Sequence, residues 1–460
     1  MDIKQIIDFN RPANEIIAAL QRRSYYLPSW EALRKEYDPE MHEVVKDPTY
    51  VDRVKKNGVE KVTRITYDLQ RLAVKRMTEL CYGIPVKRIY KTDGDERKQA
   101  AADLIDRIFK RARIDAVNLD RAHKLFASCE VLTLWYGVRQ DNYYYGKKSD
   151  IKVRCSVFSP MDGDRLYPLF DEYGDMLAMS VGYTRRVGDK DINYFDTYTA
   201  DKHYRWCDEA TGTYVLTEDE DIEVGKIPAV YTYRPTPIWE QTTRLVNEME
   251  WSMSRNGNYL RKNSRPILGV FADEAVPVEQ SPTIDKSDRD VVQLPQGSNL
   301  AYVTWNQAIE NLKFHLTELR QQFFTQLQLP DWSYESMKST PMSGESRKQL
   351  FIDAQLKVKD ESGRLLEMHD REVNVIKAFA KAISPELEEA IDQLEVENVI
   401  TPFTLTSQED EVGVLATATA GKAIMSQRTA IEKLGMVRDA DKELEQIAAE
   451  NAVDAMESAF

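Results

Sequence analysis

The histidines offer the first test for chemistry, because imidazole is the commonest side-chain ligand for protein metals. The chain has five histidines, and they are widely spaced: His42, His123, His203, His315 and His369. Glu43 follows His42, but the second histidine of a zinc-protease helix is missing. No two histidines have the spacing of metal ligands, so we expect no metal site and no metal-dependent hydrolysis.

The glycine-rich motifs of nucleotide-binding and hydrolytic proteins are also missing. The sequence contains no G-x-x-x-x-G-K-[ST], no G-x-G-x-x-G and no G-x-S-x-G. Four cysteines occur singly, with no C-x-x-C pair, at Cys81, Cys129, Cys155 and Cys207. This spacing favours reduced, buried thiols over a disulfide or a metal site. We therefore expect no catalytic residue and no cofactor.

Acidic side chains in the middle of the chain are the remaining candidates for chemistry. The run Glu-Asp-Glu-Asp at 218–221 lacks the glycine and the spaced oxygen ligands of a calcium loop, which predicts a solvated turn. If the surrounding segment were catalytic, Asp162, Asp164 and Asp171 would be the residues to test. Its many tyrosines could stack on bases or sugars, but tyrosine is also common on half-exposed strands, and we favour that interpretation.

The charge of the chain is unevenly distributed. The formal net charge is -14 over 460 residues. Residues 384–460 hold 17 Asp and Glu against 5 Lys and Arg, which leaves a balance of only -2 for the first 383 residues. Tight nucleic-acid binding needs clustered Lys and Arg, so the chain is not built to hold nucleic acid tightly. No apolar run is long enough to span a membrane, and the N-terminus has no signal-peptide pattern, which predicts a soluble intracellular product.

Periodicity divides the first half into two parts. Residues 1–130 read as helical, with apolar stripes from about Ile65 to Leu80 and from about Lys98 to Ala112. Asn57-Gly58 is a turn signal between them and the N-terminal helices. Residues 131–237 change to alternating β-branched and aromatic residues with recurrent turns, which predicts a β-rich module of several hairpins.

The second half predicts long helices around a small insert. Amphipathic helices at 238–263 and 306–328 flank a strand-containing insert at 264–305. Pro330 and Pro341 bound a loop at 329–343. A helix at 344–383 follows, in which Gly363 predicts a kink. A return strand near 399–405 within 384–406 and short helices at 407–460, chiefly 416–434 and 442–450, complete the chain.

This order of parts resembles the portal proteins, or head-to-tail connectors, of tailed bacteriophages. A helical part ends in Leu80-Cys81-Tyr82-Gly83-Ile84-Pro85-Val86, a β-rich region follows, and two helices then enclose a small strand module. The loop runs from Leu329-Pro330-Asp331 to Ser343-Gly344-Glu345-Ser346. The segments 424–430 and 439–445 are similar to the C-terminal signature of that family.

The resemblance implies an α+β, mainly helical, elongated subunit. Residues 1–237 (1–130 helical, 131–237 β-rich) and part of 384–406 would form the wing. The helices at 238–263 and 306–328 would form the stem, 264–305 the clip, 329–343 the tunnel loop, 344–383 the channel-side helix of the wing and 407–460 the crown. The implied function is a dodecameric ring at one capsid vertex, through which double-stranded DNA is packaged and later ejected.

The implied partners are further copies of the chain, DNA in non-specific passage, the terminase large subunit, a head-tail adaptor, and the major capsid and scaffold proteins. The ATPase would belong to the terminase. No membrane is implied. The implied location is the virion, with assembly in the host cytoplasm.

The resemblance also implies residues for each task. In the tunnel loop, Trp332, Tyr334, Glu335 and Lys338 would face DNA, although Trp332 could instead pack on a helix. Basic rings near the junction of stem and clip would use Arg255, Arg261, Lys262 and Arg265, unless these residues form salt bridges with neighbouring subunits. Clip strands that neighbouring copies could pair with contain Ile267, Val270, Phe271, Leu300, Tyr302 and Val303.

Two other functions remain open. One is a helical scaffold or capsid-assembly protein without a pore. The other is an enzyme that uses the β-rich module. A mostly neutral or acidic lining suits a conduit, because strong phosphate contacts would act as brakes on a sliding polyanion.

Overall fold

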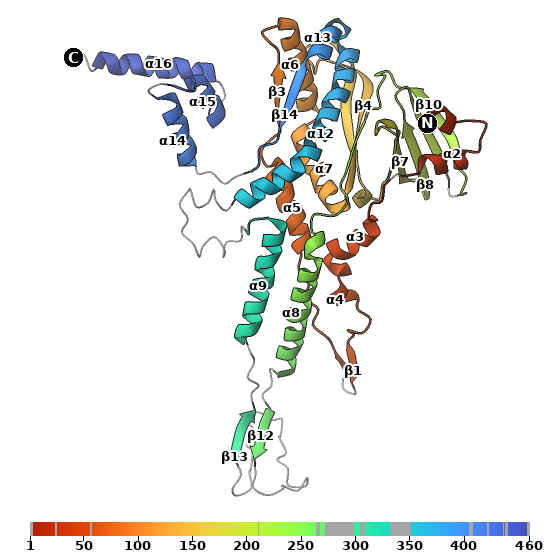
Figure 1. The fold of residues 1–460 in the computed structure, drawn as a ribbon, viewed down its shortest axis with the longest axis vertical. Coiled ribbons are helices and arrows are strands. Elements are labelled where there is room, and N and C mark those ends of the chain that lie inside the picture. Colours follow the sequence, from red (N-terminus) through yellow and green to blue (C-terminus); the bar gives the residue numbers. More distant parts are fainter. Residues whose placement is uncertain are drawn as a thin grey trace.

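A computed structural model describes residues 3–23, 25–55, 58–209, 211–263, 267–271, 299–303, 309–331, 351–403, 408–420, 423–435, 437 and 440–457. Helices and strands form a broad body from which two antiparallel helices project, with a small β-hairpin beyond their ends (Figure 1). The fold is α+β and mainly helical, as predicted. Among the described residues, no helix combines the length and apolarity needed to cross a lipid bilayer.

The N-terminal part is helical, as expected. Its helices are α1 Ile3–Ile6, α2 Ala13–Leu20, α3 Trp30–Tyr37, α4 Glu43–Lys46, α5 Leu69–Tyr82, α6 Glu96–Arg111 and α7 Ile114–Ser128. Asp95 starts α6 by accepting a hydrogen bond from the backbone N–H of Arg97 at 2.8 Å. The apolar helical stripe predicted from about Ile65 begins four residues later, because α5 starts at Leu69. The short strands β1 Arg53–Lys55 and β2 Gly58–Glu60 pair across the predicted turn.

Two antiparallel sheets form the β-rich module. A three-stranded sheet has the order β11-β4-β5, with β4 Glu130–Asn142, β5 Ser149–Phe158 and β11 Ala229–Tyr233. A five-stranded sheet has the order β10-β9-β8-β7-β6, with β6 Arg165–Phe170, β7 Met176–Val187, β8 Lys190–Tyr198, β9 Lys202–Asp208 and β10 Val215–Asp221. The turn predicted at 218–221 is wrong: these residues belong to β10, because they pair in register with β9.

The projecting helices are α8 Thr243–Asn263 and α9 Ile309–Leu327, and the hairpin beyond them pairs β12 Ile267–Phe271 with β13 Asn299–Val303 (Figure 1). Helix α8 passes through Gly257 without a break. The 32-residue helix α12, Ile352–Ile383, returns through the body, and Figure 1 shows it changing direction between its cyan beginning and its blue remainder. The helix is continuous through Gly363, where the sequence predicted a kink.

Two expectations for the C-terminal part are corrected. The return strand is β14 Glu395–Val399, which pairs with β3 Lys87–Lys91. It ends before Pro402, whose missing N–H could not continue a ladder. The helix expected at 416–434 is two helices, α14 Gln408–Thr419 and α15 Gln427–Leu434, because Ser426 caps a new start through the N–H of Thr429 at 3.2 Å. The short α13 Glu388–Gln393 and the long α16 Ala440–Glu457 complete this part.

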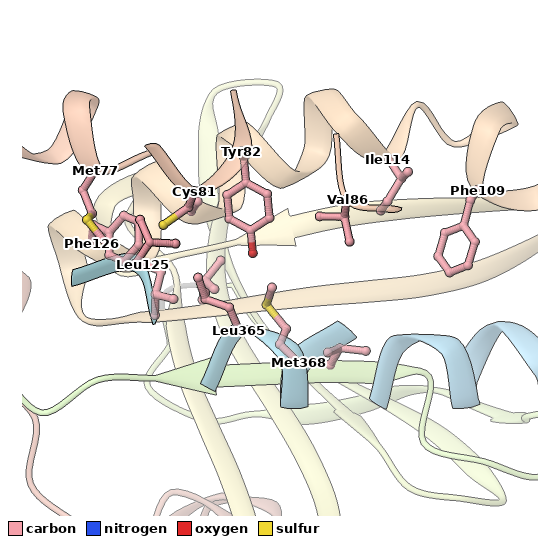
Figure 2. Packing of buried hydrophobic residues seen from close by; sticks show 14 of the residues in the cluster. Met77, Cys81, Tyr82, Val86, Phe109, Ile114, Leu125, Phe126, Leu365 and Met368 are labelled. Carbon is pink, nitrogen blue, oxygen red and sulfur yellow. The ribbon is translucent and has the colours of Figure 1, made fainter. Parts of the chain in front are cut away.

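The largest hydrophobic core joins helices that are far apart in sequence. Figure 2 shows Met77, Cys81 and Tyr82 of α5 facing Leu365 and Met368 of α12. A second core lies between the two sheets, and a third places the apolar face of α2 on the five-stranded sheet. The body is therefore one packed unit in which α12 is a central element.

The four cysteines are free thiols. Cys81 and Cys129 are buried, while Cys155 and Cys207 are partly buried. Burial raises the pKa of the Cys155 thiol to about 11. The predicted burial of the thiols holds fully for only two of the four cysteines.

Candidate functional site

The end of α9 is fixed where the predicted loop begins. Gln328 adopts a left-handed conformation with φ of 55°, which ends the helix, and the N–H of Leu329 bonds to the carbonyl of Phe324 at 3.1 Å. Arg76 of α5 donates to the carbonyl of Pro330. Asp331 forms ion pairs on two sides: Arg320 lies 3.0 Å away and Arg76 lies 3.9 Å away. Two helices therefore hold the first three residues of this loop.

Arg76 is the buried member of this cluster. Its guanidinium lies 5.3 Å from the ring centre of Phe324, and its side chain is 10% exposed. Burial lowers the pKa of Arg76, although Asp331 opposes that shift. An arginine in this setting stays charged, so Asp331 and the Pro330 carbonyl supply the polar partners that burial requires.

The predicted DNA-facing residues Trp332, Tyr334, Glu335 and Lys338 lie outside the described residues, as does the whole of 332–350. The prediction for them stands untested. The structure describes the anchored end of α9 before this segment and the start of α12 after it.

The structure describes the side chains of only two of the four predicted basic ring residues. Arg255 is exposed and lies over the Trp251 ring at 5.3 Å. Arg261 donates to the carbonyl of Lys61 at 2.9 Å and to the hydroxyl of Thr63. The side chain of Lys262 and all of Arg265 lie outside the described residues.

An extended segment at 61–67 runs along α8 and was not expected from sequence. The N–H of Thr63 donates to Asn258 at 2.7 Å and the N–H of Ile65 donates to Ser254 at 2.8 Å. A Cβ on Gly257 would come within 2.8 Å of Thr63 Cγ2. Glycine at this position is therefore explained by the close approach of the Thr63 side chain, not by a helix end.

The body end of α8 is anchored by a buried carboxylate. Glu250 accepts from the N–H of Tyr67 at 2.8 Å and lies 2.7 Å from Nδ1 of His42. The other ring nitrogen of His42 donates to the carbonyl of Glu36 at 2.7 Å. Burial disfavours a charged His42, but Glu250 reverses this effect and raises its pKa. Both nitrogens have acceptors, so His42 fits as an imidazolium paired with Glu250.

Helix α12 is anchored by a fully buried ion pair. Arg121 of α7 forms a two-bond fork with Glu372, at 2.6 and 2.8 Å. The indole N–H of Trp135 also donates to Glu372, at 3.1 Å. Burial would raise the pKa of Glu372, but Arg121 outweighs it and holds the pKa well below its usual range. Glu372 is therefore charged and fully engaged.

His369 completes the pair from the same helix. Arg121 can only donate, so Nδ1 of His369, 3.1 Å away, must accept. The hydrogen then lies on Nε2, which donates to the hydroxyl of Tyr82 at 3.1 Å. Burial lowers the pKa of His369 to about 4, which agrees with this neutral tautomer. A second pair, Arg234 with Glu361 at 2.8 Å, holds α12 to the end of β11.

Within the segment expected as the clip, the backbones of β12 and β13 pair as an antiparallel hairpin. Ile267 pairs with Val303, and Phe271 pairs with Asn299. Strands β12 and β13 thus pair with each other along their inner edges. The predicted pairing with neighbouring copies would use the outer edge of each strand. The side chains of Ile267, Val270, Phe271, Leu300, Tyr302 and Val303 are not described.

The three aspartates that an enzyme would use instead bind nearby groups of the protein. Asp162 lies 2.9 Å from Lys124. Asp164 accepts from the N–H of Ser159 at 3.1 Å, and Asp171 accepts from the N–H of Tyr173 at 2.8 Å. The last of these closes a separate hairpin turn. The three carboxylates are thus used by the backbone or by a lysine, as turn residues commonly are.

Comparison with known proteins gives the family. The family described as "Phage portal protein, SPP1 Gp6-like" matches residues 11–456. No curated protein sequence matches the chain. Among solved structures, "Neck of native GTA particle computed with C12 symmetry" aligns at 10% identity and TM-score 0.41, over 91% of this chain and 96% of that chain. "Virion of native gene transfer agent (GTA) particle" aligns at 11% identity and TM-score 0.39, over 92% and 97%. Because the family match spans nearly the whole sequence, the chain belongs to the phage portal proteins.

Proposed function

We propose that copies of this chain close into a ring of twelve around a channel at one capsid vertex, and that double-stranded DNA passes through this channel during packaging and ejection. The proposal rests on family membership, since the family is one of structural portal proteins. The single observation that carries it is the antiparallel pair α8 and α9, which projects from the body and holds the β12–β13 hairpin beyond its end (Figure 1).

In this proposal each region has one task. The stem is 238–263 with 306–328, the clip is 264–305 and the crown is 407–460. The wing comprises 1–237, 344–383 and part of 384–406. The loop at 329–343 reaches toward DNA from its anchor at Asp331. The clip would meet the terminase and later a tail adaptor, and the wing would contact capsid and scaffold proteins.

Exposed apolar side chains support side-by-side assembly. Phe314 of α9 is 71% exposed and Leu260 of α8 is 53% exposed. Both residues lie on the two projecting helices. Ile352 and Leu356, at the start of α12, are each 51% exposed. Apolar side chains this exposed, on the projecting helices and at the start of α12, favour a covering partner. In a ring, the next copy is that partner.

The test is imaging of the purified full-length chain, followed by a packaging assay. Closed rings with an axial hole support a portal. Rods, sheets or rings without a hole would favour the alternative, a helical scaffold or capsid-assembly protein.

The packaging assay uses a variant in which 333–342 is replaced by a short glycine linker. This variant should form normal rings but package DNA poorly, because Asp331 keeps its anchor while the loop beyond it is lost. The control replaces the exposed turn residues 172–174, which connect β6 and β7. Normal packaging by the shortened variant would contradict the role of the loop.

A further inference from the structure

The outer edge of the five-stranded sheet gathers side chains that can bind a metal. Strands β9 and β10 pair so that His203 faces Glu220 and Arg205 faces Glu218. Each of His203, Glu218 and Glu220 offers one ligand atom, and these three atoms lie within 4.8 Å of one another. We propose that they form a binding site for a divalent transition-metal ion such as Zn²⁺. This inference is independent of the ring and of its proposed function.

The imidazole of His203 is held in a fixed plane. It stacks on Tyr198 at 4.4 Å between ring centres and 4° between planes. Its Nε2 is buried, has no hydrogen-bond partner among the described residues and lies 3.8 Å from a carboxylate oxygen of Asp196. A hydrogen on Nε2 would point at that carboxylate, which leaves the lone pair of Nδ1 for a metal. Metal-binding histidines commonly have such a carboxylate behind the ring.

The charges around His203 favour a dication. Asp196, Glu218 and Glu220 are three carboxylates, and the facing cation is Arg205, which lies 2.9 Å from Asp196 and 2.6 Å from Glu218. With a neutral imidazole, the cluster carries two net negative charges. Glu220 is exposed, and its carboxylate makes no hydrogen bond or ion pair within the described part of the chain. Glu218 bonds to Arg205, but a carboxylate has further lone pairs for a metal.

Space and ligand type complete the argument. A cavity of about 360 Å³ borders the site and is lined by His203, Glu220, Trp135 and Phe379, among others. Water could complete the coordination shell from this cavity. One imidazole with two carboxylates suits Zn²⁺ and its first-row neighbours better than Mg²⁺ or Ca²⁺, which prefer all-oxygen shells. A bound ion would also join the edge strand β10 to β9.

The test is calorimetric titration of the tag-free full-length chain with Zn²⁺ and, separately, with Mg²⁺. We expect one Zn²⁺ site per chain and much weaker Mg²⁺ binding. His203→Phe keeps the stack on Tyr198 but removes both nitrogens, and Glu220→Gln alters only an exposed carboxylate. Each should weaken Zn²⁺ binding at least tenfold. Saturating Zn²⁺ should raise the melting temperature of the unaltered chain but not of Glu220→Gln.

The control is His315→Phe, because His315 is exposed and lies 3.5 Å from a single carboxylate, that of Glu248. It should bind Zn²⁺ like the unaltered chain. Absence of Zn²⁺ binding, binding that His203→Phe and Glu220→Gln leave unchanged, or binding that His315→Phe abolishes would each overturn the proposal.

Discussion

Removing Glu372 should destabilise the body more than any change to an exposed charge. In Glu372→Ala, Arg121 stays buried without its carboxylate and the indole N–H of Trp135 loses its acceptor. Both partners of the ion pair are almost completely buried, with side-chain exposures of 0% and 1%. Breaking a buried pair in this way costs about 3–5 kcal/mol. Urea unfolding followed by tryptophan fluorescence measures this loss in the transition that melts the body.

The double variant Arg121→Met/Glu372→Leu separates the cost of an unpaired charge from the value of the pair. It should be more stable than Glu372→Ala, because no charge is left buried. The matched control is Glu367→Ala on the same helix: Glu367 is 61% exposed and pairs with Arg371 at the surface. This control should cost no more than about 1 kcal/mol. A Glu372→Ala cost as small as that of the control would refute this reasoning. So would a double variant whose cost equals the summed costs of Arg121→Met and Glu372→Leu, each measured alone.

Three further predictions follow from the anchored segments. Asp331→Asn should lower the free energy of unfolding by about 1–3 kcal/mol, because a buried arginine loses its carboxylate; Arg320→Gln, at an exposed partner, should cost less in the same urea titration. Gly257→Ala should destabilise by about 1 kcal/mol or more, because the new methyl meets the threonine at 63 and overpacking outweighs the gain in helix propensity. Gly413→Ala, where nothing lies within 4 Å of the added carbon, should instead stabilise α14, and thermal melts that rank the two the other way would count against this explanation.

The third of these predictions concerns pH. The unfolded chain protonates His369 near pH 6.5, whereas the folded chain does so only near pH 4. The unfolded state therefore binds the additional proton first, and stability falls as pH drops between these values, by about 1.4 kcal/mol per unit. His369→Gln should flatten this slope in urea titrations at pH 7 and pH 4.5, and an unchanged slope would show that His369 is not its source.

Sequence periodicity predicted the elements that bury one continuous stripe. The apolar stripe of α12 is buried at Ala354, Val358, Leu365, Met368 and Phe379. A repeat of 3.6 residues marks the buried face of a helix whichever element packs against it. Helices α1 to α7 lie within residues 3–128 and strands β4 to β11 within 130–233, where the sequence changes from helical periodicity to alternation.

The anchoring residues could not be predicted, because they depend on pairs far apart in sequence. Glu372 lies in the apolar stripe of α12, one turn after Met368, and a charge in such a stripe is the signal that sequence reasoning overlooked. Its partner Arg121 is 251 positions away, so no local pattern could name it. The proposed metal ligands were overlooked similarly: the carboxylates were assigned to a turn, and only the register of β9 and β10 brings His203 to Glu220.

Electron microscopy of assembled particles tests the central claim most directly. A ring of this protein should occupy a single capsid vertex, with the α8 and α9 arms surrounding an axial opening wide enough for duplex DNA and the β12–β13 hairpins at its outer end. Density for this chain that is spread over the whole shell, or an assembly that is closed along its axis, would contradict the account.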